Sequence, residues 1–209
     1  IASAQGTDWL YQRGFHFGEW LIPSEDVSSF DICRETAVYT APFFAFESMR
    51  KMADIARIVG KDPVKYEDAA ENMKTAILEQ IELPEKMGAY VLAFAFGLVP
   101  AGRKEEYRKK LLSMLEKNGW CLDTGFLATP FLLDVLYDLN EKEAAERVFW
   151  QSRMPSWFYE VDHGATTIWE AWDADGARMS DRMISFDHYA FGCVDDFILR
   201  RKCGIRYDK

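Results

Sequence analysis

The sequence has 209 residues, of which 49% are apolar and 28% are charged, and its net charge is −9. This composition is typical of a soluble globular domain, and such a length allows roughly 70% of the unfolded surface to be buried. The acidic balance disfavours a nucleic acid or another polyanion as a partner, because phosphate binding needs clusters of lysine and arginine.

The first half of the chain predicts helices. Apolar residues recur at three- and four-residue steps from 34 to about 59, and Pro42 predicts that this helix either begins or kinks there. Asp62 followed by Pro63 is a strong helix start, so a second helix is expected from 62 to about 81. Segment 85–97 is apolar nearly all round, which predicts a helix buried on most sides.

The second half continues the helical pattern. Residues 102–117 predict a charged amphipathic helix, and 125–138 carry a leucine stripe that predicts a buried face. Asn140 with Glu143 is interpreted as a capping pair for a helix through about Gln151, and a last helix is expected over 187–202. Because β-branched alternation is scarce, we expect an all-α fold of about seven helices whose neighbours pack as antiparallel pairs.

Several other classes of site are disfavoured. The four cysteines are far apart without a C-x-x-C pair, so neither a zinc ribbon nor a disulfide framework is expected. No ligand spacing suggests a metal ion, and no cofactor is expected. No apolar run approaches the ~20 residues that cross a bilayer, so no membrane partner is expected. The chain starts at Ile1 without a signal-like segment, which leaves its compartment unknown, with the cytoplasm favoured over secretion.

Four segments combine glycine, aromatic rings and polar groups that could act on a substrate: GFHFGEWLIP (14–23), LDTGFLATPFLLDVLYDL (122–139), PSWFYEVDHGATTIWEAWD (155–173) and SFDHYAFGCVDDF (185–197). Function tends to lie in such loops over a helical scaffold. Glu170, between Trp169 and Trp172, is either a stray acid in a piece of core or a catalytic carboxylate in the wall of a sugar pocket. Each segment alone is weak evidence, because most loop glutamates are solvated and most histidines near a helix start are structural.

In this order and spacing, the pieces GFHFGEWL, LDTGFLATPFLL, PSWFYEVDHGATTIWEAWD and SFDHYAFG resemble the bacterial α-L-rhamnosidases of glycoside hydrolase family 78. The resemblance covers nearly the whole chain. It departs from the family at Glu19, where Asp is usual, and at Asp187, where Asn is usual. It implies an (α/α)6 barrel of twelve helices in two concentric layers. Residues 1–209 would be a partial catalytic domain that lacks its N-terminal helices and any flanking β-sandwich domains.

The resemblance also implies a reaction, the hydrolysis of terminal α-L-rhamnosides with inversion. Glu170 matches the family's general base, Trp20 a tryptophan that lines the rhamnose site, and His188 a histidine that hydrogen-bonds sugar hydroxyls. The partner would be a rhamnose-containing oligosaccharide or glycoside. The family's general acid belongs to a motif upstream of this chain, so we expect the 209 residues alone to be inactive. Three further residues in matching segments receive no role: Asp123, Trp157 and Tyr159.

Two other functions stay open on the sequence. One is a different (α/α)6 carbohydrate hydrolase, such as a trehalase-like enzyme or a glucuronyl hydrolase. The other is a non-catalytic helical module that binds a sugar or a protein and keeps the aromatic rings as packing. An incomplete barrel would also expose apolar helix faces, so we expect self-association as a homo-oligomer.

Overall fold

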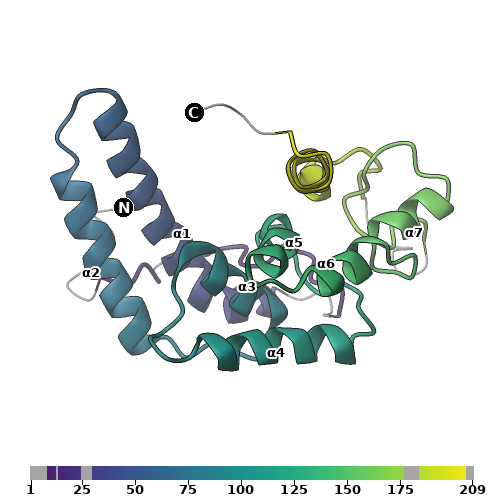
Figure 1. Ribbon diagram of the computed structural model, residues 1–209, viewed down its shortest axis with the longest axis horizontal. Coiled ribbons are helices and arrows are strands. Elements are labelled where there is room, and N and C mark those ends of the chain that lie inside the picture. The colour runs from purple at the N-terminus through teal and green to yellow at the C-terminus, as the bar shows by residue number, and fades with distance from the viewer. Residues whose placement is uncertain (1–8, 13, 25–29, 177–183, 206–209) are drawn as a thin grey trace.

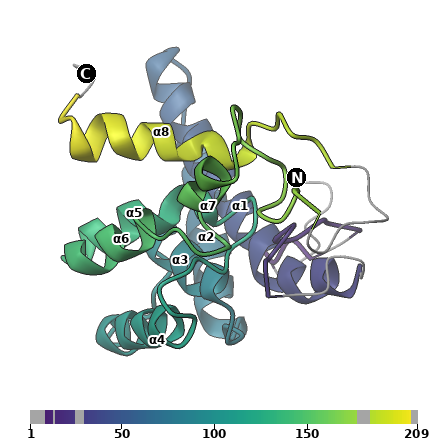
Figure 2. The ribbon, with the colours of Figure 1, turned by 90° about the vertical axis from the view of Figure 1, so that its right-hand side faces the viewer.

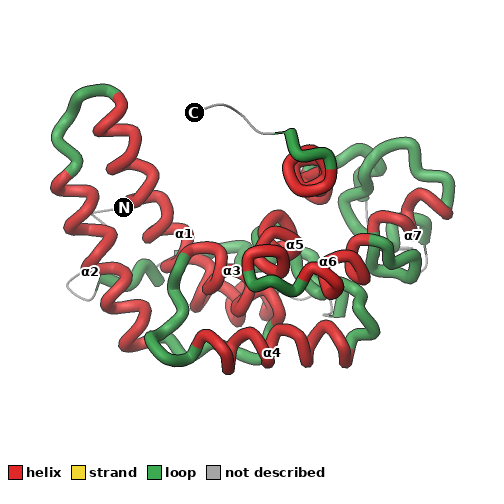
Figure 3. The backbone as a smooth tube through the Cα atoms, in the orientation of Figure 1, coloured by secondary structure: helices red, strands yellow, loops and turns green. Residues whose placement is uncertain are grey.

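The computed structural model describes residues 9–12, 14–24, 30–176 and 184–205, and the regular elements within these ranges are all helical (Figures 1 and 3). The expected all-α class is confirmed. The α-helices are α1 (Asp31–Ile58), α2 (Val64–Gln80), α3 (Met87–Phe96), α4 (Lys104–Lys117), α5 (Thr129–Asp138), α6 (Lys142–Phe149), α7 (Trp157–Asp162) and α8 (Val194–Phe197). A 3-10 turn, η2 (Ala190–Cys193), precedes α8, and a π-helical turn, η3 (Ile198–Lys202), follows it.

Helix α3 is the centre of the packing. It contacts α1, α4 and α5, and its Ala89, Val91, Leu92 and Ala93 are fully buried. The prediction of a helix buried on most sides is therefore confirmed. Helices α1 and α2 form a hairpin whose far end extends away from the other helices, and the segment from η2 to η3 lies over α5 (Figures 1 and 2).

Helix α1 passes through Pro42 instead of beginning there. Proline has no N–H, so the carbonyl oxygen of Val38, one turn earlier, lacks its usual helical donor. The side-chain amide of Gln12 lies 3.5 Å from that oxygen, so a long side-chain contact takes the place of the missing helical hydrogen bond. The next helix begins slightly later than predicted, with Pro63 instead of Asp62 in the N-cap position. Asp62 Oδ1 accepts the N–H of Val64 at 3.0 Å, and α2 begins at Val64.

The turn between α5 and α6 corrects one prediction. Asn140 does not cap α6 with Glu143, because α6 begins at Lys142 after Glu141 and has no side-chain cap. Asn140 has a φ of 62°, in the left-handed region that asparagine tolerates better than most residues, and its N–H donates to the Tyr137 carbonyl oxygen. It therefore ends α5 instead of starting α6.

Helix α7 lies in a segment, 152–186, for which the sequence predicted no helix. It has six residues, too few to show a helical period, but its start carries a signal. Ser156 Oγ accepts the N–H of Tyr159 at 3.1 Å, which is N-cap geometry. Trp157 and Glu160, three residues apart, are both buried and share the inner face of this short helix.

Two short basic runs, 108–110 and 200–202, contain residues that pair with acids. Arg200 and Arg201 both contact Asp134 of α5, and Lys202 contacts Glu146 of α6 at 2.5 Å. Arg108 contacts Glu105 and Glu141. The pairs at 200–202 attach the C-terminal helical segment to α5 and α6, and Arg108 links α4 to the α5–α6 turn.

Three general features complete the fold. Over the residues that the structure describes, no helix is long and apolar enough to cross a membrane. No group of three or more histidine, cysteine or carboxylate side chains that could hold a metal ion occurs in the same ranges. All four cysteines are free thiols; Cys33 and Cys121 are buried, Cys193 is partly buried and Cys203 is exposed.

Candidate active site

Residues 18–20 lie directly against the start of α5. The N–H of Phe126 donates to the Trp20 carbonyl oxygen at 3.0 Å, and the N–H of Ala128 donates to Glu19 Oε1 at 2.9 Å. A Cβ atom on Gly125 would lie 2.2 Å from the Trp20 oxygen, so glycine is needed at this position. The motifs GFHFGEWL and LDTGFLATPFLL, which are about a hundred residues apart, therefore form one structural unit.

The ring of Trp20 lies at the surface among other aromatic rings. It meets Phe17 edge to face with 5.5 Å between ring centroids, and Phe30 with a tilt of 31° at 6.2 Å. Trp20 is partly buried, whereas Phe17 and Phe30 are 59% and 54% exposed. An indole held in this way can offer an apolar face to a ligand.

The indoles on either side of Glu170 point into the core. Trp169 and Trp172 are both buried, and Trp172 stacks on Phe191 with 4.2 Å between centroids. Trp169 meets Phe186 edge to face at 5.5 Å. The indole N–H of Trp157 donates to the Phe191 carbonyl oxygen at 2.8 Å. These rings join the loop after α7 to the start of the C-terminal helical segment, and so they position Glu170 through packing.

Glu170 itself is partly buried and is fixed at two points by Ser185. Its backbone N–H donates to the Ser185 carbonyl oxygen at 2.9 Å, and its Oε2 accepts the Ser185 N–H at 2.9 Å. The carboxylate therefore has a defined position, although the residue lies in a loop. A fixed and partly exposed carboxylate is suited to receive a proton from a bound water.

His188 is held between two aromatic rings. It stacks on Phe126 with 5.1 Å between centroids and on Tyr189 with 5.2 Å. Its Nδ1 accepts the N–H of Ala190 at 3.3 Å, so in the neutral ring the proton is on Nε2. His188 can thus present an N–H donor to a hydroxyl group.

The three predicted site residues lie on segments that contact one another. Phe126 bonds to Trp20 through its backbone and stacks on His188 through its ring. The N–H of His188 in turn donates to the carbonyl oxygen of Ile168, at 2.8 Å, two residues before Glu170. Two backbone hydrogen bonds and one ring stack therefore connect four segments that are distant in sequence.

The remaining candidates have structural contacts. Asp123 accepts hydrogen bonds from the N–H and the hydroxyl of Ser24, at 2.9 and 2.8 Å, which ties the end of the first motif to the second. The hydroxyl of Tyr159 donates to Asp175 at 2.9 Å, on the loop after Glu170. Trp157 is the core residue described above. None of these contacts defines a catalytic role.

The sequence did not single out Glu160, which is the acid most closely associated with the Glu170 loop. It is 1% exposed, and its Oε2 accepts the N–H of Trp169 at 3.1 Å. Burial raises its pKa to about 7, because the carboxylate loses water and gains only one backbone donor. The spacing of Trp157 and Glu160 after the Ser156 cap is the signal that could have indicated an inward-facing acid.

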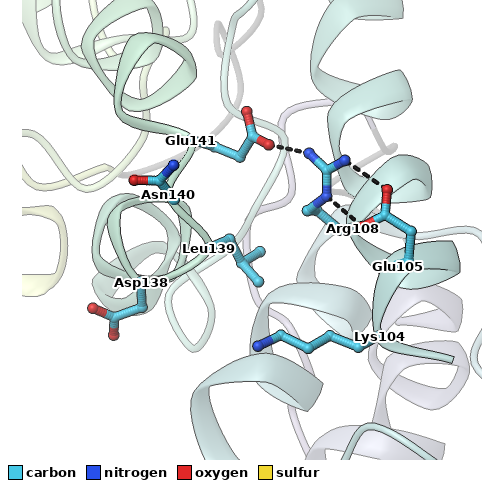
Figure 4. A pocket seen from close by; sticks show the side chains of 7 residues that line it. All are labelled: Lys104, Glu105, Arg108, Asp138, Leu139, Asn140 and Glu141. Atoms are coloured by element: carbon cyan, nitrogen blue, oxygen red, sulfur yellow. Dashed lines mark hydrogen bonds and ion pairs between the residues drawn. The ribbon is translucent and has the colours of Figure 1, made fainter. Parts of the chain in front are cut away.

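Two surface hollows lie away from these residues. One of about 480 Å³ is bounded by α4 and the α5–α6 turn, where Arg108 is paired with Glu105 and Glu141 (Figure 4). Another of about 310 Å³ lies beside α1, α2 and the end of α3. Neither contains Trp20, Glu170 or His188. Because the first is lined mainly by charged side chains that neutralise one another, it offers no apolar face for a sugar.

A scaffold of paired helices, with acidic and aromatic loops connected to one another, places the chain in the class of (α/α)-barrel proteins. Residues 2–201 match the family model described as the bacterial alpha-L-rhamnosidase 6 hairpin glycosidase domain, and the chain belongs to this family. Its helices form part of the (α/α)6 barrel. Membership in this family decides against the trehalase-like and glucuronyl hydrolase alternatives.

Similar proteins carry the same family name. An alpha-L-rhamnosidase of Streptomyces avermitilis is 32% identical over 95% of this chain and 19% of its own length, and one of Formosa agariphila is 30% identical over 90% and 22%. The crystal structure of Streptomyces avermitilis alpha-L-rhamnosidase complexed with L-rhamnose superposes with a TM-score of 0.86 and 30% identity, over 99% of this chain and 20% of that one. The chain thus spans about a fifth of the length of these relatives.

Proposed function

We propose that this chain supplies part of the active site of an inverting α-L-rhamnosidase and that Glu170 is its general base. The observation that supports this most is the double attachment of Glu170 to Ser185, through its N–H and through Oε2. It holds a partly exposed carboxylate in place on a loop joined to His188. The full-length protein, meaning the product of the complete open reading frame that contains this chain, would carry the activity.

The proposed reaction needs two carboxyl groups on opposite sides of the sugar. Glu170 takes a proton from a water molecule, whose oxygen attacks the anomeric carbon of the rhamnosyl group as the glycosidic bond breaks. The leaving oxygen receives a proton from a carboxylic acid that the family carries upstream of the residues matched here. The two carboxyl groups of an inverting enzyme are roughly 6.5–9.5 Å apart, which leaves space for the water.

Trp20 and His188 would bind the sugar in this proposal. The partly buried indole of Trp20 suits the methyl group and apolar face of a deoxysugar. The Nε2–H of His188, fixed by the contact of Nδ1 with the Ala190 N–H, would donate to a sugar hydroxyl. The substrate would be a terminal α-L-rhamnosyl group of an oligosaccharide or glycoside.

The direct test follows the first sugar released from p-nitrophenyl α-L-rhamnoside by NMR. We expect the full-length protein to release β-L-rhamnose first, because inversion exchanges the anomeric configuration. The isolated 209-residue polypeptide is expected to release none, since it lacks the acid. Initial release of α-L-rhamnose would contradict the inverting mechanism. Turnover by the 209 residues that Glu170→Gln abolishes would show that the acid lies within them.

We also propose that this chain self-associates when isolated. Apolar side chains are exposed around the far end of the α1–α2 hairpin: Met52, Ile55, Ile58, Val59 and Val64. Exposed apolar patches of this kind favour contacts between molecules. We expect concentration-dependent oligomers in light scattering, and Ile55→Glu with Ile58→Glu to shift them to monomer. Lys51→Glu, on the same helix, is the control and should leave the oligomers unchanged. A monomer at all concentrations would contradict the proposal.

A further inference from the structure

Glu19 attaches the segment of Trp20 to two helices at once. Its backbone N–H donates to Thr36 Oγ1 of α1 at 2.8 Å, and that hydroxyl donates to the Ile32 carbonyl oxygen at 2.7 Å. Its side chain reaches the other way and accepts the N–H of Ala128 before α5. We call residues 18–20, together with 125–128, the Glu19 strap.

The packing around the strap leaves space for this one side chain and little more. A Cβ atom on Gly88 of α3 would lie 3.2 Å from both Cδ and Oε2 of Glu19. A Cβ atom on Gly18 would lie 2.1 Å from Thr36 Oγ1, and the φ of Gly18 is +59°. Glycine at both positions thus allows the close approach of three segments around the carboxyl group.

A carboxyl group at this buried position carries a desolvation cost. Glu19 is 0% exposed, and its Oε2 has no hydrogen-bond partner within the part of the chain that the structure describes. Burial raises its pKa to about 7, although the backbone N–H groups of Ala128, Gly125 and Leu127 favour the charged form. An apolar side chain would avoid this desolvation cost. The stability of the fold alone therefore does not account for an acid here.

The strap is directly connected to both proposed sugar-binding residues. Trp20 follows Glu19 in the chain, and its carbonyl oxygen accepts the N–H of Phe126, inside the strap. The ring of Phe126 then stacks on the imidazole of His188 with an angle of 21°. A shift of the strap would consequently move the indole and the imidazole relative to each other.

We propose that Glu19 is a positioning residue, whose hydrogen bond to the start of α5 fixes Trp20 relative to His188 and so sets the geometry of the sugar site. This inference rests on the proposed rhamnosidase function. Its physical part, the coupling of Trp20 to His188, is independent of any substrate and can be tested separately.

The first test uses NMR of the folded full-length protein without substrate. The indole N–H signal of Trp20 is assigned by its absence from the spectrum of Trp20→Phe. The Cε1–H signal of His188 is assigned in the same way with His188→Gln. We expect Glu19→Leu to shift both signals, because it removes the acceptor for the Ala128 N–H. Glu19→Gln keeps a side-chain oxygen acceptor and should leave both near their original positions. Leu111→Ala, in the α4 core, controls for general destabilisation and should move neither.

The second test uses the kinetics of the full-length protein. We expect Glu19→Leu to raise KM for p-nitrophenyl α-L-rhamnoside about tenfold or more, with a smaller change in kcat, since the sugar-binding residues are displaced while Glu170 is held elsewhere. Glu19→Gln should restore KM to near the original value. A purely structural role would instead lower the amount of folded protein and leave KM unchanged, as expected for Leu111→Ala.

The outcomes separate this inference from the function on which it rests. Unchanged Trp20 and His188 signals in Glu19→Leu would overturn the positioning role, whatever the enzyme hydrolyses. An activity that survives Glu170→Gln would overturn the function and leave the NMR result intact. If Glu19→Leu does not fold, Gly88→Ala is the second variant, because its methyl group would lie against the same carboxyl group. The proposal then requires that Gly88→Ala shift both the Trp20 and the His188 signals.

Discussion

Replacing Glu170 with glutamine is expected to lower kcat of the full-length protein by about 10²- to 10⁴-fold, the usual contribution of a general base. Glutamine has nearly the same shape and can still accept the Ser185 N–H, but it cannot take a proton from water. KM should change little, because the contacts assigned to Trp20 and His188 remain. The measurement is steady-state hydrolysis of p-nitrophenyl α-L-rhamnoside.

A second variant distinguishes the loss of a general base from a structural effect on the loop. Asp173→Asn is the matched control, because it removes a carboxylate three residues later on the same loop. It should keep the rate. Equal losses in the two variants would argue for a structural effect of the loop and against a base at Glu170.

The sequence was most informative where the chain makes local structure. Helical spacing predicted the long helices, and the apolar run at 85–97 predicted the burial of α3. The sequence did not predict α7, because six residues are too few to show a helical period. It also assigned Asn140 to the start of α6, whereas the left-handed backbone of Asn140 belongs to the end of α5. Local patterns predict long elements well, because many residues then carry the same signal.

The site was less predictable, because its contacts connect distant parts of the chain. Nothing near Glu19 in sequence indicates that its carboxyl group meets Ala128, a contact that the fold alone creates. The aromatic neighbours of Glu170 suggested a pocket wall, whereas the structure directs Trp169 and Trp172 into the core. The motif indicated a loop with a candidate base, and only the packing shows that its two indoles are buried while Glu170 is partly exposed.

Glu160 provides the clearest test of the electrostatics in this loop, because its neutral form fits the site better than its charged form. Its Oε1 is buried without a hydrogen-bond partner among the described residues, and Oε2 accepts only the Trp169 N–H. The pKa is raised from 4.5 to about 7. Since the folded protein holds this proton more tightly than the unfolded chain does, stability falls as pH rises from about 4.5 to above 7.

We therefore expect Glu160→Gln to change the pH dependence of stability. Glutamine resembles the protonated side chain and keeps an acceptor for the Trp169 N–H, so both proteins should be similarly stable near pH 4.5. At pH 8 the variant should be more stable by up to about 3 kcal/mol, which follows from a shift of this size at about 1.4 kcal/mol per pKa unit. For a chain of this length that is roughly 6–12 °C in Tm.

The measurement is urea or thermal unfolding at both pH values, followed by circular dichroism. Glu19, which is also buried, loses its proton over the same range in both proteins, so its contribution cancels in the comparison. Glu116→Gln on the exposed face of α4 is the matched control, and its stability should change with pH in the same way as that of the original protein. A stability difference that stays constant from pH 4.5 to 8 would mean that Glu160 does not hold its proton in the folded state. A buried negative charge would then lie beside the backbone of Trp169, the residue that precedes Glu170.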